Sequence, residues 1–273
     1  LAYLNRSRFP YLVSVRGSDV PGYNRRFSLD YIFLRPLFNR IYGSARRVVA
    51  NSQGLKDLFE SQFPHLQADV IPNGVDLEQF RPRESGGGPD STREMSLVTA
   101  ARLIPRKGID VLLQACARLA AANQSFQCHI IGDGPEETPL RHLAASLGIT
   151  ERVHFHGRME KDPIAEFLPR CDIFVLPSYA EGMSNAALEA MACGLPLLLT
   201  DTGGSRELID GNGAIVPPGD AARLAETLAS WLAHPGAVRE MGARSREHAG
   251  NFSWAGVAVR YHDLYRQILD AKG

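Results

Sequence analysis

The fold is decided by the stretch Asp172-Ile-Phe-Val-Leu-Pro-Ser-Tyr-Ala-Glu-Gly-Met-Ser-Asn-Ala-Ala-Leu-Glu-Ala-Met-Ala-Cys-Gly-Leu-Pro-Leu-Leu-Leu-Thr200. Its two ends, 172–176 and 195–200, are short apolar runs that suit buried strands, and 185–192 has the composition of a crossover helix. A strand, a helix and a second strand in this order form a βαβ unit, in which the two strands lie parallel in one sheet. The stretch therefore predicts an α/β fold with a parallel sheet.

The alternation of apolar runs and amphipathic stretches continues on both sides of this unit, from residue 96 onward. The further strand candidates are 96–101, 127–131, 153–156 and 214–216. The further helix candidates are 109–122, 138–147 and 163–169, with a helical tail over 221–272 that is broken at Pro235-Gly236. Repeated βαβ units imply a parallel sheet whose two faces are both covered by helices.

A smaller series of strand candidates precedes residue 77, at 11–15, 47–50 and 69–71. Three strands are too few for an independent doubly wound sheet. The sequence opens at Leu1, close to the first of these strands, with nothing before it to form a neighbouring layer. We therefore expect a further upstream segment to complete this domain.

Residues 81–90 are rich in Pro, Gly and charge, which is the composition of a linker. This segment predicts a boundary between two domains. We expect a partial first domain over 1–78, a second domain over 79–256, and a final helix over 257–273 that crosses back to the first domain.

The composition limits the location and the partners of the chain. The 273 residues carry 30 basic and 30 acidic side chains, so no overall charge favours nucleic acid or an anionic surface. No run of 18 apolar residues indicates a membrane span, and the first residues lack the order of a signal peptide. The four cysteines form no CxxC pair, which favours buried thiols over zinc ligands or disulfides. We expect a soluble, cytoplasmic chain without a metal site.

Polar and glycine-rich segments follow three of the strand candidates, at the place where open parallel sheets bind ligands. These segments are 102–108, 132–136 and 177–185. Arg102 supplies a forked cation, Lys107 supplies a point charge, and the helix start at 182–184 supplies free backbone amides. Because the carboxyl ends of parallel strands share one edge, we expect the three segments to form a site for a pyrophosphate.

Two carboxylates bracket this helix start. Glu189 lies about one to two turns inside the helix, where it can accept two hydrogen bonds from a ribose diol. Glu181 lies just outside the first turn, where it can hold sugar hydroxyls or stabilise positive charge on a sugar ring. A simpler reading exists for Glu181 alone, since an acidic residue near a helix start also complements the helix dipole.

The segment from Glu181 to Glu189, with the following residues 190–196, resembles the E-x7-E signature of retaining GT-B glycosyltransferases of family 4. Further segments agree with this family in the same order along nearly the whole chain: 71–76, Arg102 with 107–108, 131–136, 155–157 and 202–207. The resemblance implies a GT-B fold, which has two Rossmann-like domains with parallel sheets. The first of these domains would be incomplete here.

The resemblance also implies roles for single residues. In this family an Arg and a Lys hold the donor diphosphate, and these positions are Arg102 and Lys107. The first Glu of the signature contacts the transferred sugar and the second binds the ribose, which implies these roles for Glu181 and Glu189. The loop after Phe-x-Gly, here 158–159, packs on the base. The further donor-binding positions are Gly134, Met159, Gly182, Met183 and Ser184.

One departure from the family lies on the acceptor side. Many members have His-Gly after a strand of the first domain, whereas this sequence has Arg16-Gly17-Ser18-Asp19. We therefore expect no His role at this position, and we expect Arg16 or Asp19 to face the acceptor or the phosphate instead.

The resemblance implies transfer of a sugar from a UDP-, GDP- or ADP-sugar to a glycan or lipid-linked acceptor, with retention of configuration and without a metal or other cofactor. A lipid-linked acceptor would bring the chain to the inner face of a membrane. Two other functions stay open, a non-catalytic nucleotide-sugar-binding module and a sugar epimerase on the same two domains. A nicotinamide dehydrogenase is disfavoured because Glu137 stands where its fingerprint needs a third Gly. The need for an acceptor distinguishes the transferase from the other two.

Overall fold

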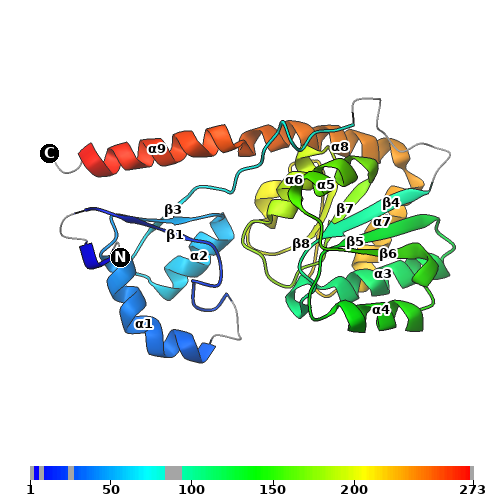
Figure 1. The fold of residues 1–273 in the computed structure, drawn as a ribbon, viewed down its shortest axis with the longest axis horizontal. Helices are drawn as coiled ribbons and strands as arrows, with labels where there is room; N and C mark the ends of the chain where they lie inside the picture. The colour runs from blue at the N-terminus through cyan, green and yellow to red at the C-terminus, as the bar shows by residue number, and fades with distance from the viewer. Residues whose placement is uncertain (1–2, 6–8, 24–27, 84–93, 271–273) are drawn as a thin grey trace.

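The computed structural model describes residues 3–5, 9–23, 28–83 and 94–270, and these residues build two sheets (Figure 1). The smaller sheet has the strand order β1-β2-β3, and the larger has the order β6-β5-β4-β7-β8-β9. All neighbouring strands in both sheets are parallel. The expected α/β fold class is therefore confirmed. Most of the expected linker, 84–90, lies outside the described residues.

The first domain contains β1 (Leu12–Val15), α1 (Ser28–Gly43), β2 (Arg47–Ala50), α2 (Gln53–Gln62) and β3 (Ala68–Val70). The second domain contains β4 (Met95–Ala100), α3 (Ile109–Ala121), β5 (Phe126–Ile131), α4 (Glu137–Ser146), β6 (Val153–Gly157), α5 (Lys161–Phe167), β7 (Ile173–Leu176), α6 (Asn185–Ala192), β8 (Leu197–Thr200), β9 (Gly213–Val216), α7 (Ala221–Ala233) and α8 (Pro235–Ala249). The last helix is α9 (Trp254–Asp270). Each expected strand is present within a few residues, and α6 has the expected bounds.

The strand order of the larger sheet has one switch point, between β4 and β7. The strands β4, β5 and β6 follow one another outward in one direction, whereas β7, β8 and β9 follow in the other. Sheets of this kind bind ligands at the carboxyl ends of the strands beside the switch point. The segments after β4 and β7 therefore occupy the place where a ligand is expected.

Both faces of the larger sheet are buried at its centre, as the nearly continuous apolar strands β4, β7 and β8 require, whereas His154 and His156 of the edge strand β6 are exposed. Leu97 and Val175 pack with α3, α4 and α7 on one face. Val98 and Phe174 pack with α6 on the other face. The sheet is thus held rigidly between two layers of helices, which fixes the loops at its carboxyl ends.

The smaller sheet is covered by α1 and α2 on one face and by α9 on the other (Figure 1). The alternation of side chains along β2 explains this arrangement, because neighbouring residues of a strand point to opposite faces. Val48 packs with Phe59 of α2, whereas Val49 packs with Val257 and Leu264 of α9. Since α9 follows the second domain in the chain, its packing ties the two domains together.

Several exposed apolar side chains of the first domain lie on α1, including Ile32, Phe33 and Leu37. The same helix also carries Asp30 and Arg40 in its terminal turns.

Within the described ranges, every helix is too short or too polar to cross a membrane.

Arg246 of α8 holds the segment that leads from the first domain to the second. Its guanidinium group donates hydrogen bonds to the carbonyl oxygens of Leu77 at 3.1 Å and Phe80 at 2.9 Å. A third bond goes to the carbonyl oxygen of Ala192, at the end of α6, at 2.8 Å. One side chain therefore fastens the connecting segment to the helix that begins at the expected site.

Replacing Arg246 with Ala should lower the free energy of unfolding by about 2–4 kcal/mol, because three carbonyl groups lose a charged donor. Urea unfolding measures this change. Arg239→Ala is the matched control, since Arg239 is an exposed residue of the same helix. Equal losses in the two variants would show that these hydrogen bonds do not hold the segment.

Candidate functional site

The turn after β5 is packed so closely that it requires glycine. Gly132 and Gly134 have φ angles of 134° and 153°, which other residues rarely adopt. A Cβ atom on Gly132 would lie 1.9 Å from the carbonyl oxygen of Ala101, and one on Gly134 would lie 2.3 Å from that of Leu103. The two glycines therefore let the loops after β4 and β5 meet at the sheet edge.

A hollow of about 470 Å³ opens at the carboxyl ends of β4 and β5, and we call it the sheet-end hollow. Its lining includes Arg102, Gly132, Met159, Asn185 and Glu189. The structure thus brings three predicted donor-binding residues, Arg102, Met159 and Glu189, into one cavity. The volume falls in the range of about 300–1,000 Å³ that is typical of small-molecule sites.

Glu189 lies in the wall of this hollow and is partly buried. Burial raises its pKa to about 7, and the positive charge of Lys161 opposes part of this rise. Carboxyl groups that titrate near neutral pH inside a cavity are concentrated at functional sites. Glu189 can therefore meet a ligand either as an acceptor or as a donor of hydrogen bonds.

Lys107 and Glu181 form an ion pair near the domain boundary. Lys107 Nζ donates to Glu181 Oε1, and the hydroxyl of Ser178 donates to the same oxygen at 3.2 Å. The two side chains are only 15% and 12% exposed, so water screens the pair weakly. The phosphate role of Lys107 stays a prediction, and the structure pairs its ammonium group with the carboxylate of Glu181. The loops after β4 and β7 touch here, since a Cβ atom on Gly108 would lie 2.1 Å from the carbonyl oxygen of Pro177.

The start of α6 is fixed by its own cap and by the first domain. Ser184 is the N-cap residue, and its hydroxyl accepts from the amide of Ala187 at 3.3 Å. The side-chain amide of Asn73 donates to the carbonyl oxygen of Met183 at 3.1 Å and to Asn185 Oδ1 at 2.8 Å. Met183 and Ser184 are therefore held in place by contacts within the protein.

Polar residues follow each strand of the first domain and face the second domain. Arg16 follows β1, Asn51 follows β2, and Asn73 lies shortly after β3. The guanidinium group of Arg16 donates to Asn73 Oδ1. Asn51 Oδ1 is buried without a hydrogen-bond partner, and a Cβ atom on Gly182 would lie 3.0 Å from it. Asn51 is not among the predicted site residues, although it directly follows a strand, as those residues often do.

Asp19, the other expected acceptor-side residue, contacts its own loop. Its carboxylate accepts from the amide of Arg16 at 2.9 and 3.0 Å and from the amide of Gly17 at 2.7 Å. Gly17 has a φ of 138°, and a Cβ atom there would lie 2.8 Å from the ring of Tyr23. Asp19 therefore stabilises the loop that carries Arg16 and Tyr23.

A hollow of about 230 Å³ lies between the domains, and we call it the interdomain hollow. Its lining includes Tyr23, Leu55, Leu58, Tyr179, Glu181 and Thr202. Burial raises the pKa of Tyr23, and the nearby Glu181 carboxylate raises it further, so the phenol stays protonated. The guanidinium carbon of Arg106 lies 5.4 Å from the centre of the Tyr23 ring. Aromatic faces beside a carboxylate suit a ligand with apolar faces and hydroxyl groups.

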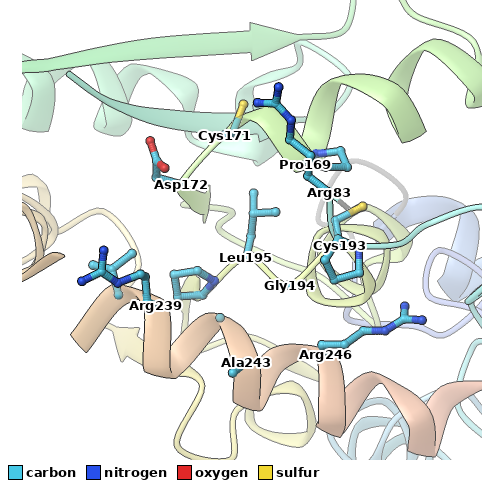
Figure 2. Close-up of a pocket in the computed structure, with 14 residues that line it drawn as sticks. Arg83, Pro169, Cys171, Asp172, Cys193, Gly194, Leu195, Arg239, Ala243 and Arg246 are labelled. Carbon is cyan, nitrogen blue, oxygen red and sulfur yellow. The ribbon is translucent and has the colours of Figure 1, made fainter. Parts of the chain in front are cut away.

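A third hollow, of about 530 Å³, lies at the amino ends of β7 and β8 (Figure 2). Its lining includes Asp172, Cys193, Leu195, Arg239 and Arg246. The guanidinium group of Arg246 is engaged with three carbonyl oxygens, as described above. This hollow lies at the end of the sheet opposite to the expected ligand edge and contains none of the predicted site residues.

The described residues contain no group of three or more His, Cys, Asp or Glu side chains that could hold a metal ion. The four cysteines, which all lie in the described part of the chain, are buried free thiols. The cysteines are therefore buried thiols, as the sequence predicted.

Two family models together match most of the chain. The model described as Glycosyl transferases group 1 matches residues 85–248, and the model described as Glycosyltransferase Family 4 matches residues 1–79. The D-inositol 3-phosphate glycosyltransferase of Streptomyces bingchenggensis is 31% identical over 254 residues, which are 84% of this chain and 54% of that relative. The GDP-mannose-dependent monoacylated alpha-(1-6)-phosphatidylinositol monomannoside mannosyltransferase of Corynebacterium glutamicum is 33% identical over 225 residues, 76% of this chain and 58% of that relative. The chain thus spans little more than half the length of these relatives.

Solved structures resemble the chain over both domains. Sucrose-phosphate synthase from Thermosynechococcus elongatus has a TM-score of 0.82 at 25% identity, covering 99% of this chain and 71% of that chain. The Anabaena protein HepE, solved in complex with UDP and glucose, has a TM-score of 0.80 at 22% identity, covering 98% of this chain and 73% of that chain.

Replacing Glu189 with Gln should raise the melting temperature at about pH 8 but not at about pH 3.5, which lies below the pKa of an unfolded Glu. An unfolded Glu has a pKa of about 4.3, so between about pH 4.3 and the folded value near 7 the folded state holds an extra proton. Stability of the unchanged chain therefore falls as the pH rises through this window, whereas Gln does not ionise. Thermal denaturation over a pH series measures the difference. A difference that does not widen between about pH 4.3 and 7 would show that the folded pKa of Glu189 is ordinary.

Proposed function

The chain belongs to the glycosyl transferases group 1 family, and from this premise we propose that it transfers a sugar from a nucleoside-diphosphate sugar to an acceptor hydroxyl group with retention of configuration. The observation that carries this proposal is the position of two carboxylates on either side of the α6 start. Glu189 lines the sheet-end hollow, and Glu181 lines the interdomain hollow. A nucleotide in the first hollow would thus point its sugar towards the second.

The sheet-end hollow would hold the nucleoside and its phosphates. Glu189 would bind the ribose diol, and the segment 158–159 would pack on the base. Arg102 would donate a forked pair of hydrogen bonds to the diphosphate. The similarity to a GDP-mannose-dependent mannosyltransferase supports a nucleoside-diphosphate sugar as the donor. UDP-, GDP- and ADP-sugars are the candidates.

Binding of the diphosphate would change the partner of Lys107. Its ammonium group hydrogen-bonds to Glu181, and an incoming diphosphate would compete for it as a more highly charged anion. This exchange would release the Glu181 carboxylate to meet the transferred sugar. Arg102 and Lys107 together would compensate the charge that develops on the leaving diphosphate, so that no metal ion is required.

Glu181 would act on the sugar ring. Its carboxylate can accept hydrogen bonds from sugar hydroxyls and stabilise the positive charge that builds up as the bond to the diphosphate breaks. Retention requires the acceptor to approach from the side on which the diphosphate leaves. Hollows that lie on either side of one helix start are compatible with this approach.

The interdomain hollow would hold the acceptor. Tyr23 and Tyr179 offer ring faces to a sugar, and Glu181 lies in the same wall. Arg16 lies at the edge of the first domain that faces this region, through its contact with Asn73. The similarity to a D-inositol 3-phosphate glycosyltransferase and to a phosphatidylinositol monomannoside mannosyltransferase supports a hydroxyl-rich acceptor, such as a glycan or a lipid-linked sugar.

Replacing Arg102 with Ala should weaken the binding of a nucleoside diphosphate by about 1.5–3 kcal/mol, because a charge-assisted hydrogen bond is lost. Binding of the matching nucleoside should change by less than about 0.5 kcal/mol, since Arg102 would not contact it. Isothermal titration calorimetry with both ligands measures the two losses. Equal losses for both would exclude a phosphate role for Arg102.

Replacing Glu181 with Gln should leave nucleoside-diphosphate binding intact or strengthen it, because Lys107 loses a competing charged partner. Transfer to an acceptor should fall by at least about a hundredfold, since the charge that stabilises the transition state is lost. Calorimetry measures the first effect, and transfer assays with labelled donor measure the second. Normal turnover by the variant would remove Glu181 from the mechanism. Turnover without any acceptor would favour an epimerase instead.

A further inference from the structure

Glu207 contacts the first domain in a way that the proposed function does not use. It lies in the 3-10 turn η6 (Ser205–Leu208), and its Oε1 accepts a hydrogen bond from the main-chain amide of Gln53 at 2.6 Å. Gln53 is the first residue of α2, and the hydroxyl of Ser52 accepts from the amide of Leu55 at 3.2 Å. The first turn of α2 is therefore capped from both domains, with a carboxylate at the positive end of the helix dipole.

The same turn of α2 lies against the backbone beside Glu181. A Cβ atom on Gly54 would lie 2.5 Å from the carbonyl oxygen of Gly203, and one on Gly203 would lie 1.9 Å from that of Glu181. The amide of Gly204 donates to the carbonyl oxygen of Gly182 at 2.5 Å. Segment 203–204 is thus packed between α2 and residues 181–182, without room for a side chain. A shift of α2 towards or away from this segment would be transmitted to Glu181.

The surroundings of Glu207 leave the start of α2 as its main partner. Burial raises the pKa of its carboxyl group, the Gln53 amide opposes the rise, and the charge of Asp57 adds to it. Arg206, its neighbour in the chain, is paired with Asp201 at 2.9 and 2.6 Å. Among the ion pairs of the described residues, none joins Glu207 to a Lys or Arg. The first turn of α2 is therefore the main electrostatic partner of this carboxylate.

We infer that Glu207 is a positioning residue for the sugar transfer: by capping α2 across the domain boundary, it holds segment 203–204 against Glu181 and fixes that carboxylate for the reaction. The inference rests on the proposed function, because Glu181 is the group assigned to the sugar. The sheet-end hollow has no lining residue from α2 or from η6. Glu207 should therefore affect turnover and leave the affinity for the donor unchanged.

A variant of Gln53 removes the amide that Glu207 binds, and a second variant controls for the loss of the Gln53 side chain. Gln53→Pro deletes this N–H group at the first helical position, where Pro is favoured. The preceding Ser52 has φ −159° and ψ 159°, a conformation that a following Pro accepts. Gln53→Ala is the matched control, because it keeps the N–H group and loses only the side chain with its hydrogen bond to Asp57.

Two separate variants change Glu207. Glu207→Ala removes the carboxylate, whereas Glu207→Gln keeps an oxygen that can accept the hydrogen bond. We expect Gln53→Pro and Glu207→Ala each to lower kcat about ten- to a hundredfold, the effect of one charge-assisted hydrogen bond. Glu207→Gln should recover part of the loss, and Gln53→Ala should differ little from the unchanged chain. The KM for the donor, and the Kd from calorimetry with a nucleoside diphosphate, should stay unchanged in all four.

The double variant with Gln53→Pro and Glu207→Ala should be no slower than the slower single variant, because both changes remove the same contact. Unchanged kcat in Gln53→Pro, with normal binding of the nucleoside diphosphate, would overturn the inference and leave the proposed function intact. Additive losses, or losses of donor affinity in step with kcat, would also overturn it, because they indicate a general disturbance. Failure of the unchanged chain to bind any nucleoside diphosphate would overturn the proposed function itself.

Discussion

The arrangement of the site depends on the switch point of the larger sheet. The strands β5 and β6 extend from one side of β4, whereas β7, β8 and β9 extend from its other side. The loops after β4 and β7 are therefore neighbours. The first loop carries Arg102 and Lys107, and the second leads through Glu181 into α6. The ion pair between Lys107 and Glu181 is the direct result. The comparisons with solved structures confirm the expected GT-B fold, in which such an edge faces a second domain.

The first domain meets this edge mainly through main-chain and polar contacts. Asn73 binds the start of α6, Glu207 binds the start of α2, and Gly54 lies against Gly203. Polar contacts of this kind depend on geometry more than packed apolar surfaces do, because a hydrogen bond weakens steeply when its distance or angle changes. A boundary built in this way can place a carboxylate accurately when the domains are close. Apolar packing also joins the two parts of the chain: α9 packs on the smaller sheet, and Val75 and Leu77 pack into the core beside α6.

Much of the fold and part of the site could be predicted from the sequence, because both rest on local patterns. The apolar runs predicted the strands, and the composition of 185–192 predicted α6. Arg102 and Glu189 line one hollow, because the βαβ order brings the loop after β4 close to α6, and their roles in donor binding stay a prediction. The pairing of Lys107 with Glu181 could not be predicted, because it depends on side-chain directions after two separate strands. The contact of Gln53 with Glu207 joins residues 154 positions apart and depends on how the two domains dock.

The central claim is that the sheet-end hollow binds the nucleoside-diphosphate part of a sugar donor. It is tested most directly by the melting temperature of the unchanged chain in the presence of UDP-, GDP- and ADP-sugars, since a ligand of the native state raises this temperature by mass action. The account predicts that at least one of the three raises the melting temperature with a saturating dependence on concentration, and that the rise is lost when Arg102 and Glu189 are both replaced. The absence of any such rise, or a rise that survives the loss of both residues, would contradict it.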